Sequence, residues 1–208
     1  MANFAQIKNI LFDLGGVILD LDVHGTLEKF LNMGLKKELL NYPENFHTDI
    51  FFNYETGRTT TEQFRDSIRN YSGIDFSDRE FDDAWCAMLT RVPVRRIELL
   101  KSLNERYSLY MLSNTSPLHI EHFEQMFLDT AGFPFNEVFT GTYYSYKIGL
   151  HKPDSEAFEH VLKDAEILAE ETLFLDDNIH NIKTAKALGF NAIHITEHLR
   201  MEDLGFDM

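Results

Sequence analysis

Near its start the chain reads Ile10-Leu11-Phe12-Asp13-Leu14-Gly15-Gly16, an apolar run that ends abruptly in a carboxylate and two glycines. A short aliphatic and aromatic run with this punctuation is typical of a β-strand buried on both faces. The chain repeats the pattern three more times, and each run is followed by polar residues or glycine. The four expected strands are Ile10–Phe12, Leu109–Leu112, Leu173–Leu175 and Ala192–Ile195.

Helical patterns separate the later strands. Apolar residues recur at helical spacing from Phe158 to Ala165 and again from Ile182 to Leu188, where Gly189 supplies a stop signal. Short buried strands that alternate with amphipathic helices predict a parallel sheet with helices on both faces. The expected fold class is therefore α/β, with a Rossmann-like doubly wound parallel sheet as its core.

Residues 21–92 follow another pattern, with helical periodicity and no convincing strand. Two segments have the spacing of a capping box, which marks the start of a helix. These segments are Thr59 with Glu62 and Ser77 with Glu80. Pro93 then begins a helix that returns the chain to the sheet. We expect a core made of residues 1–20 and 93–208, with an α-helical cap inserted at residues 21–92.

Composition narrows the possible partners. The formal net charge is −15 and no basic stripe offsets it, so we expect no nucleic-acid partner. We expect no signal peptide and no membrane partner, because no apolar run approaches the roughly 20 residues that cross a bilayer. The single cysteine, Cys86, lies in an apolar helical pattern and should simply pack there. The chain is expected to be cytoplasmic, as a monomer or a homodimer.

Three of the expected strands end in groups that can do chemistry: Asp13, Ser113-Asn114 and Asp176-Asp177. In open α/β sheets, ligands bind outside the carboxyl ends of the strands. We therefore expect these groups to meet, joined by Lys152 from the segment before a helix. Several carboxylates in one place need a compensating cation. Hard oxygen ligands suit Mg²⁺, which keeps several waters and is commonly shared with a phosphate group.

The order of these groups resembles the four motifs of the haloacid dehalogenase (HAD) superfamily. In sequence order the motifs are Asp13-x-Gly15, Ser113, Lys152-Pro153 and Asp176-Asp177 with Asn181. The likeness spans essentially the whole chain, because residues 21–92 are similar to the helical C1-type cap of that family. The Phe-Asp-Leu-Gly segment resembles that of sugar-phosphate phosphatases in the superfamily, glucose-1-phosphate phosphatases among them.

This resemblance implies a Mg²⁺-dependent phosphatase of a small phosphorylated metabolite, with a sugar phosphate favoured. Asp13 is then the nucleophile and forms an aspartyl-phosphate. The resemblance assigns the metal to Asp13, the carbonyl of Gly15 and Asp177. It places Asp176 beside the metal as a direct or water-mediated ligand.

The same resemblance implies how phosphate is bound. Ser113 and the amide of Asn114 hold phosphate oxygens, and Lys152 neutralises both the nucleophile and the transferring group. Asn181 orients the acidic pair. Arg58, in a turn of the cap, is a further candidate for binding substrate as a phosphate or hydroxyl donor.

One position departs from the family pattern. Its phosphatases usually carry a second Asp two residues after the nucleophile, where it protonates the leaving group, and this chain has Gly15 there. Loss of a general acid costs roughly 10²- to 10⁴-fold in rate, so the rate should depend steeply on the pKa of the leaving group. His151, Asp20 and Asp22 are the candidates to replace the acid, against roles as solvated or hinge residues.

Two other functions stay open at this point. Carbon–halogen hydrolysis requires no leaving-group acid, but it needs no Mg²⁺ and leaves Asp176-Asp177 unexplained. A catalytically silent protein that binds a phosphometabolite is also compatible with Gly15. The aromatic residues of the cap are expected to pack its interior and not to stack on a ligand. These residues are Phe46, Phe51, Phe52 and Tyr54.

Overall fold

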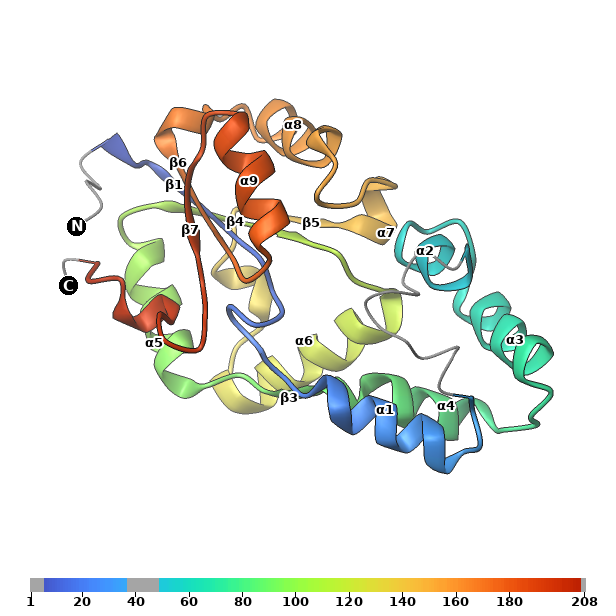
Figure 1. Cartoon of the computed structure of the whole chain (residues 1–208). Helices are drawn as coiled ribbons and strands as arrows, with labels where there is room; N and C mark the ends of the chain where they lie inside the picture. Colours follow the sequence, from blue (N-terminus) through green and yellow to red (C-terminus); the bar gives the residue numbers. More distant parts are fainter. Residues whose placement is uncertain (1–5, 37–48, 207–208) are drawn as a thin grey trace.

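A five-stranded sheet forms the centre of the computed structural model, which describes residues 6–36 and 49–206 (Figure 1). The strand order is β5-β4-β1-β6-β7, and each neighbouring pair is parallel. The bounds are β1 Asn9–Phe12, β4 Ser108–Ser113, β5 Gly141–Tyr144, β6 Thr172–Asp176 and β7 Asn191–His194. The four predicted strands are confirmed. The edge strand β5 is additional, and it has no aliphatic run that would have predicted it.

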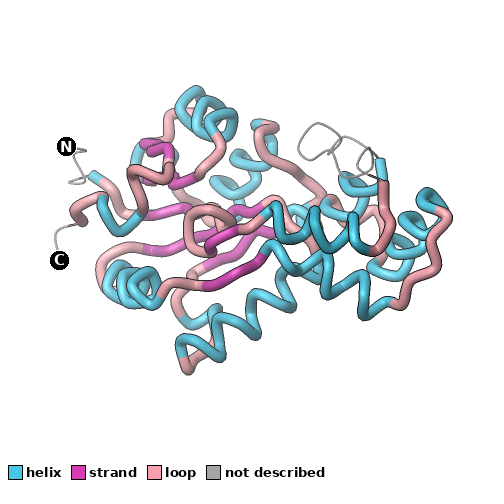
Figure 2. Tube along the Cα trace, turned by 60° about the horizontal axis from the view of Figure 1, so that its bottom comes forward, coloured by secondary structure: helices cyan, strands magenta, loops and turns pink. Residues whose placement is uncertain are grey.

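Helices cover both faces of this sheet, as the α/β prediction requires (Figure 2). Successive side chains of β1 point to opposite faces. Ile10 and Phe12 pack in the cluster that contains α5 and α6, whereas Leu11 packs in the cluster that contains α8 and α9. These helices are α5 Val94–Asn104, α6 Pro117–Ala131, α8 Ser155–Asp164 and α9 Ile179–Ala187. The shorter helices of the core are α7 Ser145–Ile148 and the 3-10 helices η4 Phe135–Glu137, η5 Ala169–Glu171 and η6 Met201–Asp203.

The strand register aligns the carboxyl ends of the central strands. Phe12 of β1 is opposite Leu175 of β6, and the backbone N–H of Asp13 donates to the carbonyl of Leu175 at 2.8 Å. Asp13 and Asp176 therefore leave the sheet side by side.

A two-stranded antiparallel ribbon lies where the chain leaves the sheet and returns to it. It pairs β2 Asp20–Leu21 with β3 Leu89–Arg91. Between these strands lie α1 Val23–Asn32, α2 Asp49–Glu55, α3 Thr61–Ser72, α4 Asp78–Trp85 and η3 Cys86–Met88. Figure 1 shows α1 to α4 gathered at one end of the molecule. The cap boundaries at residues 20/21 and 92/93 lie beside this ribbon and stay a prediction.

Aromatic side chains fill the interior of the helical insertion. The ring of Phe64 lies 4.1 Å from that of Tyr54 and 5.7 Å from that of Phe51, measured between centroids. Tyr54 and Phe51 are buried, as expected. Phe52 is half-buried and packs near His151 instead. Phe46 lies outside the described residues.

The two predicted capping boxes have different outcomes. The predicted pairs are Ser77 with Glu80 and Thr59 with Glu62. The first is confirmed at the start of α4. The second is wrong by one residue, because α3 begins at Thr61 and Thr60 is its N-cap. The Gln63 N–H donates to Thr60 Oγ1 at 3.2 Å, and the Thr60 N–H donates to Gln63 Oε1 at 2.9 Å.

The start of α6 joins the insertion to the core. Ser116 caps this helix, and its Oγ accepts a hydrogen bond from Trp85 Nε1 at 3.2 Å. The ring of His119 stacks on Trp85 with centroids 4.6 Å apart, and its Nε2 lies 3.1 Å from the Trp85 carbonyl oxygen. Cys86 is buried beside them, as predicted. Across residues 6–36 and 49–206, no helix combines the length and the apolar character needed to span a membrane.

Candidate active site

Lys152 forms two ion pairs at the carboxyl edge of the sheet. Its Nζ donates to Asp13 Oδ1 at 2.8 Å and to Asp176 Oδ2 at 2.7 Å. Asp13 directly follows β1, Asp176 ends β6, and Lys152 comes from the turn before α8. The Lys152 side chain is 1% exposed, and that of Asp176 is fully buried. The structure thus brings together three of the predicted residues in a largely buried setting.

Amide groups hold the buried carboxylate of Asp176. Asn181 Nδ2 lies 3.0 Å from both of its oxygens, and the N–H of Asn178 donates to Oδ1 at 2.7 Å. Asn178 also caps α9, which carries Asn181 in its first turn. The helix start therefore fixes the orientation of Asp176.

The protonation states of this group depend on burial and on neighbouring charge. Burial raises the pKa of Asp13 to about 7; Lys152 opposes the rise, and Asp176 and Asp177 add to it. Burial also raises the pKa of Asp177, as does the charge of Asp176. Burial lowers the pKa of Lys152, but the Asp13 and Asp176 carboxylates outweigh this effect and leave it raised. One ammonium group thus faces three carboxylates, and a further cation would relieve the imbalance.

The three carboxylates could hold that cation. Asp13, Asp176 and Asp177 each offer an oxygen atom, and these atoms lie within 4.8 Å of one another. Asp177 is exposed, so this side of the group is open to water. Gly16, without a side chain, leaves the space in which the Asp177 carboxylate lies. Hard oxygen ligands with an open side fit Mg²⁺.

Asn114 positions the segment that carries Lys152. The backbone N–H of Lys152 donates to Asn114 Oδ1 at 2.9 Å, and Asn114 Nδ2 donates to the Lys152 carbonyl at 2.8 Å. The same Nδ2 lies 3.1 Å from His151 Nδ1. The side chain of Asn114 is thus engaged within the protein, so a phosphate contact from this residue is left to its backbone amide.

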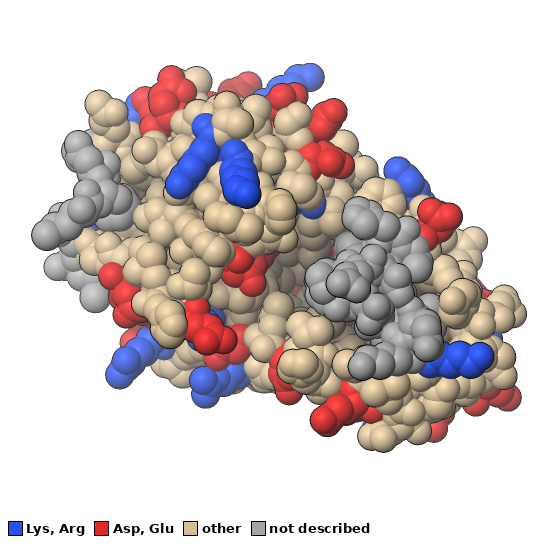
Figure 3. All heavy atoms as spheres, in the orientation of Figure 1, with Lys and Arg blue, Asp and Glu red and all other residues tan. Residues whose placement is uncertain are grey.

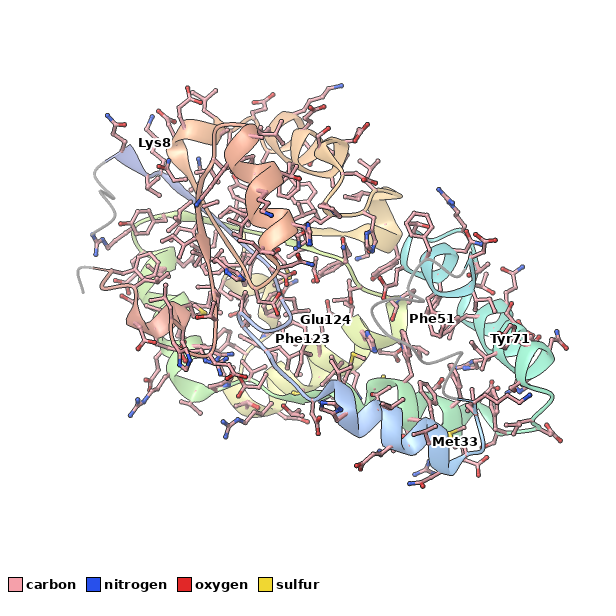
Figure 4. The ribbon with its side chains drawn as sticks, viewed as in Figure 1. Lys8, Met33, Phe51, Tyr71, Phe123 and Glu124 are labelled. Atoms are coloured by element: carbon pink, nitrogen blue, oxygen red, sulfur yellow. The ribbon has the colours of Figure 1, made fainter. Side chains whose placement is uncertain are left out.

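A cavity adjoins this group on the side of the insertion. Gly15, Ser113 and Asn114 line it from the edge of the sheet, and Phe51 and Glu55 line it from α2. Figure 3 shows a hollow near the centre of this face with acidic side chains at its edge, and Figure 4 shows Phe51 on the side of the insertion toward the sheet. Most of the remaining wall is apolar, with Leu19, Leu21, Val23, Leu27, Phe30 and Trp85.

Arg58 lies apart from the other predicted site residues. It is exposed, its guanidinium is 5.0 Å from the centroid of the Phe52 ring, and it is absent from the described lining of the cavity. The sequence indicated a cap turn here, and the turn is present. Arg58 interacts with Phe52 at the surface and does not reach the residues around Asp13.

Asp20 and Asp22, two candidates for the missing acid, are engaged elsewhere. The carboxylate of Asp20 forms ion pairs with Arg91 at 2.9 Å and with Arg96 at 3.0 Å. Asp22 is the N-cap of α1, where its Oδ1 accepts from the Gly25 N–H at 3.1 Å. Both aspartates thus have structural partners at the base of the insertion.

His151, the third candidate, is brought to the site together with a residue that the sequence did not single out. His151 Nε2 lies 3.4 Å from Glu55 Oε2. Glu55 is 5% exposed, and burial raises its pKa while His151 lowers it. The signal for Glu55 in the sequence is weak: it is a carboxylate that ends the aromatic segment Phe51-Phe52-Asn53-Tyr54, just before a turn.

A parallel α/β sheet with this constellation at its carboxyl edge, and with helices inserted after the first strand, is the arrangement of HAD-like hydrolases. Residues 7–189 match the family model of haloacid dehalogenase-like hydrolases. The chain belongs to this family.

Its relatives include two phosphatases. The chain is 33% identical over 185 residues to D-ribitol-5-phosphate phosphatase of Bacteroides thetaiotaomicron, covering 89% of this chain and 90% of the relative. It is 25% identical over 194 residues to the sesquiterpene phosphatase astK of Aspergillus oryzae, covering 92% and 91%. A solved HAD family enzyme of B. thetaiotaomicron, in complex with magnesium and inorganic phosphate, superposes with a TM-score of 0.82 at 38% identity, covering 90% and 93%.

Proposed function

We propose that this chain is a Mg²⁺-dependent phosphatase that hydrolyses a small phosphorylated metabolite through an aspartyl-phosphate. The observation that carries the proposal is Lys152, buried between Asp13 and Asp176, with the open carboxylate of Asp177 beside them. Phosphoryl transfer requires an oxygen nucleophile, cations around the transferring group and fixed donors for its oxygens. This site offers each of these.

Asp13 is the proposed nucleophile. Its Oδ1 is held by Lys152, and no described side chain hydrogen-bonds its Oδ2, which leaves that oxygen to react. Lys152 lowers the pKa of Asp13 against the effect of burial, and it also compensates charge on the transferring phosphate. Ser113, at the end of the neighbouring strand, and the backbone amide of Asn114 are the proposed phosphate donors. Arg58 is not part of this proposed set, because it lies on the surface.

The proposed metal ligands are Asp13, the carbonyl of Gly15 and Asp177, with Asp176 direct or through water. When bound, Mg²⁺ supplies positive charge where the phosphate oxygens become more negative. The magnesium complex of the related enzyme supports magnesium as the metal, and the D-ribitol-5-phosphate phosphatase supports the phosphatase activity.

For the substrate, we propose the phosphate of a sugar or a sugar alcohol. The relative named D-ribitol-5-phosphate phosphatase supports this class of substrate. The Phe-Asp-Leu-Gly segment alone suggested a sugar-1-phosphate instead. The cavity beside Gly15 and Ser113 is the proposed site of the alcohol part. Because most of the cavity wall is apolar, the monophosphate of an apolar alcohol is the alternative substrate to compare with it.

The test is a substrate panel with purified protein and Mg²⁺. D-ribitol-5-phosphate, glucose-1-phosphate, a hexose-6-phosphate, an isoprenyl monophosphate and p-nitrophenyl phosphate are compared by kcat/KM, each with and without excess chelator. We expect phosphate release that chelator abolishes, with the highest value for a polyol phosphate. Full activity in chelator contradicts the metal site. Halide release from 2-haloacids, or phosphate binding without turnover, would instead support one of the two competing functions.

A further inference from the structure

A buried carboxylate of the insertion lies at the reaction cavity and has no part in the function proposed so far. Glu55 is the last residue of α2 and lines the same cavity as Gly15 and Ser113. An ionisable group that is only 5% exposed in a mostly apolar wall costs free energy unless a partner compensates it. The partner that the structure supplies is His151, at 3.4 Å.

Hydrogen bonds determine how His151 faces Glu55. The N–H of Lys152 donates to Asn114 Oδ1, so the other end of that amide, Nδ2, is the donor toward His151 Nδ1. Because Nδ1 accepts this hydrogen bond, the ring carries its proton on Nε2, which faces Glu55 Oε2. A continuous series of contacts therefore connects Glu55 to Lys152, whose Nζ contacts the Asp13 carboxylate.

The other groups around the cavity do not replace the missing acid. A Cβ on Gly15 would lie 2.7 Å from Leu21 Cδ1, so Leu21 fills the space of a side chain at this position. His119 also lines the cavity, but its Nε2 is engaged with the Trp85 carbonyl, and burial lowers its pKa to about 4. Among the described residues of the lining, Glu55 is the remaining acidic side chain, and it can give and take a proton.

We propose that Glu55 is the general acid and base of this phosphatase, in place of an acidic residue at position 15, and that His151 is its positioning residue. The inference rests on the proposed phosphatase function. Burial raises the pKa of Glu55 although His151 lowers it, and the raised pKa favours the protonated form that a general acid needs.

The proposed reaction has two steps. In the first, an oxygen of Asp13 forms a bond to phosphorus, the bond from phosphorus to the alcohol oxygen breaks, and the Glu55 carboxyl gives its proton to that oxygen. In the second, water attacks phosphorus, the Glu55 carboxylate takes one proton of this water, and the bond from phosphorus to Asp13 breaks. Alcohol and inorganic phosphate leave, and Asp13 and Glu55 return to their starting states.

Glu55→Gln tests the proposal, because the amide keeps the shape of the side chain and cannot donate an acidic proton. The substrates are substituted phenyl phosphates, which differ in leaving-group pKa and carry no hydroxyl group that Glu55 could bind. We expect kcat/KM to fall by roughly 10²- to 10⁴-fold for phenyl phosphate but by less than about tenfold for p-nitrophenyl phosphate. The plot of log(kcat/KM) against leaving-group pKa therefore becomes steeper.

The second step gives an independent readout. The kcat of Glu55→Gln for p-nitrophenyl phosphate should fall, because water is no longer activated, and a burst of nitrophenol should report aspartyl-phosphate that accumulates. Glu62→Gln, an exposed change on α3, is the matched control and should alter neither the slope nor the burst. If Glu55→Gln does not fold, as judged by circular dichroism, Glu55→Asp carries the same test and should give an intermediate slope.

His151 is tested by a double-variant cycle. His151→Asn should steepen the slope less than Glu55→Gln does, and the double variant should be no slower than Glu55→Gln alone, because His151 acts through Glu55. Additive losses would contradict that role.

Each remaining outcome is informative. An unchanged slope, or an equal loss on every substrate, overturns Glu55 as the acid while leaving the phosphatase in place. A parent protein that hydrolyses none of the phosphate esters overturns the proposed function, and this inference with it.

Discussion

The carboxylate of Asp177 lies in the space that a side chain on Gly16 would occupy. A Cβ built on Gly16 would be 2.3 Å from Asp177 Oδ2, and Gly16 has a φ of +70°, in the left-handed region. The loop after β1 and the loop after β6 can therefore pack closely because position 16 has no side chain. This contact sets where the exposed member of the acidic group can lie.

Gly16→Ala should weaken Mg²⁺ binding by about tenfold or more, because Asp177 must move. Gly149→Ala is the control: its φ of +72° imposes similar backbone strain, but nothing lies within 4 Å of the added Cβ. Gly149→Ala should lose about 1 kcal/mol of unfolding free energy, and Gly16→Ala should lose at least as much. Calorimetric titration with Mg²⁺ separates them, and equal affinities would show that Asp177 is not held by this contact.

Asp13→Asn should lower kcat by about 10³-fold or more, because the amide is nearly isosteric with the carboxylate and a far poorer nucleophile. The variant should stay folded, since Lys152 keeps its ion pair with Asp176. Urea unfolding and circular dichroism serve as controls beside the rate measurement. Turnover close to that of the parent would reject Asp13 as the nucleophile.

Lys152→Met should lower the unfolding free energy by about 3 to 5 kcal/mol, because it leaves Asp13 and Asp176 buried without their cation. Added Mg²⁺ should recover part of this loss by restoring positive charge. Lys147→Met, at an exposed position, is the control. Urea unfolding with and without Mg²⁺ makes the comparison, and an equal, small effect in both variants contradicts the electrostatic role of Lys152.

His119 should make the folded state less stable in mild acid. Its pKa is about 4 when folded, because of burial, against about 6.5 in the unfolded chain, so between these values the unfolded chain binds more protons. Stability is then complete above about pH 6.5 and declines as the pH falls toward 4, by about 3 kcal/mol in total. His119→Gln should remove this decline. The measurement is the difference in urea-unfolding free energy between parent and variant, taken at pH 5 and at pH 7.5. The same difference at both pH values would show that His119 does not cause the decline.

Gly15→Asp should act as a substitute acid only when Leu21 is shortened, because Leu21 Cδ1 lies 2.7 Å from the added Cβ. In the Glu55→Gln background, Gly15→Asp with Leu21→Ala should make the leaving-group dependence of kcat/KM shallower. Leu21→Ala alone in that background is the control and should not. A slope that stays steep in both would mean that position 15 does not reach the departing oxygen.

The sequence predicts the core of this protein well because each central strand combines a buried apolar run with a functional residue at its end. Asp13, Ser113 and Asp176 could be placed by this rule alone. The edge strand Gly141–Tyr144 could not, since it lacks an apolar run. The helix of residues 117–131 is not among the predicted elements, although its buried residues Ile120, Phe123 and Phe127 have the spacing of a helix.

Side-chain environments were harder to predict than strands. Glu55 and Arg58 are three residues apart and both are charged, yet one is buried against His151 and the other lies on the surface. Their difference arises from how α2 packs on the turn before α8, a contact between residues about 100 positions apart. The choice between Thr59 and Thr60 as helix cap is similarly local, because both have an acidic or amide partner three residues later.

The contacts at the start of α6 limit how freely this insertion can be exchanged. Trp85 of the insertion is hydrogen-bonded to Ser116 and His119 of the core. The Tyr54 hydroxyl accepts a hydrogen bond from the N–H of Leu118 at 3.3 Å. A chimera that took its helical insertion from a relative would leave these core groups facing foreign side chains. Residues 116–119 would have to be transferred together with the insertion, so the unit that can be recombined is not continuous in the chain.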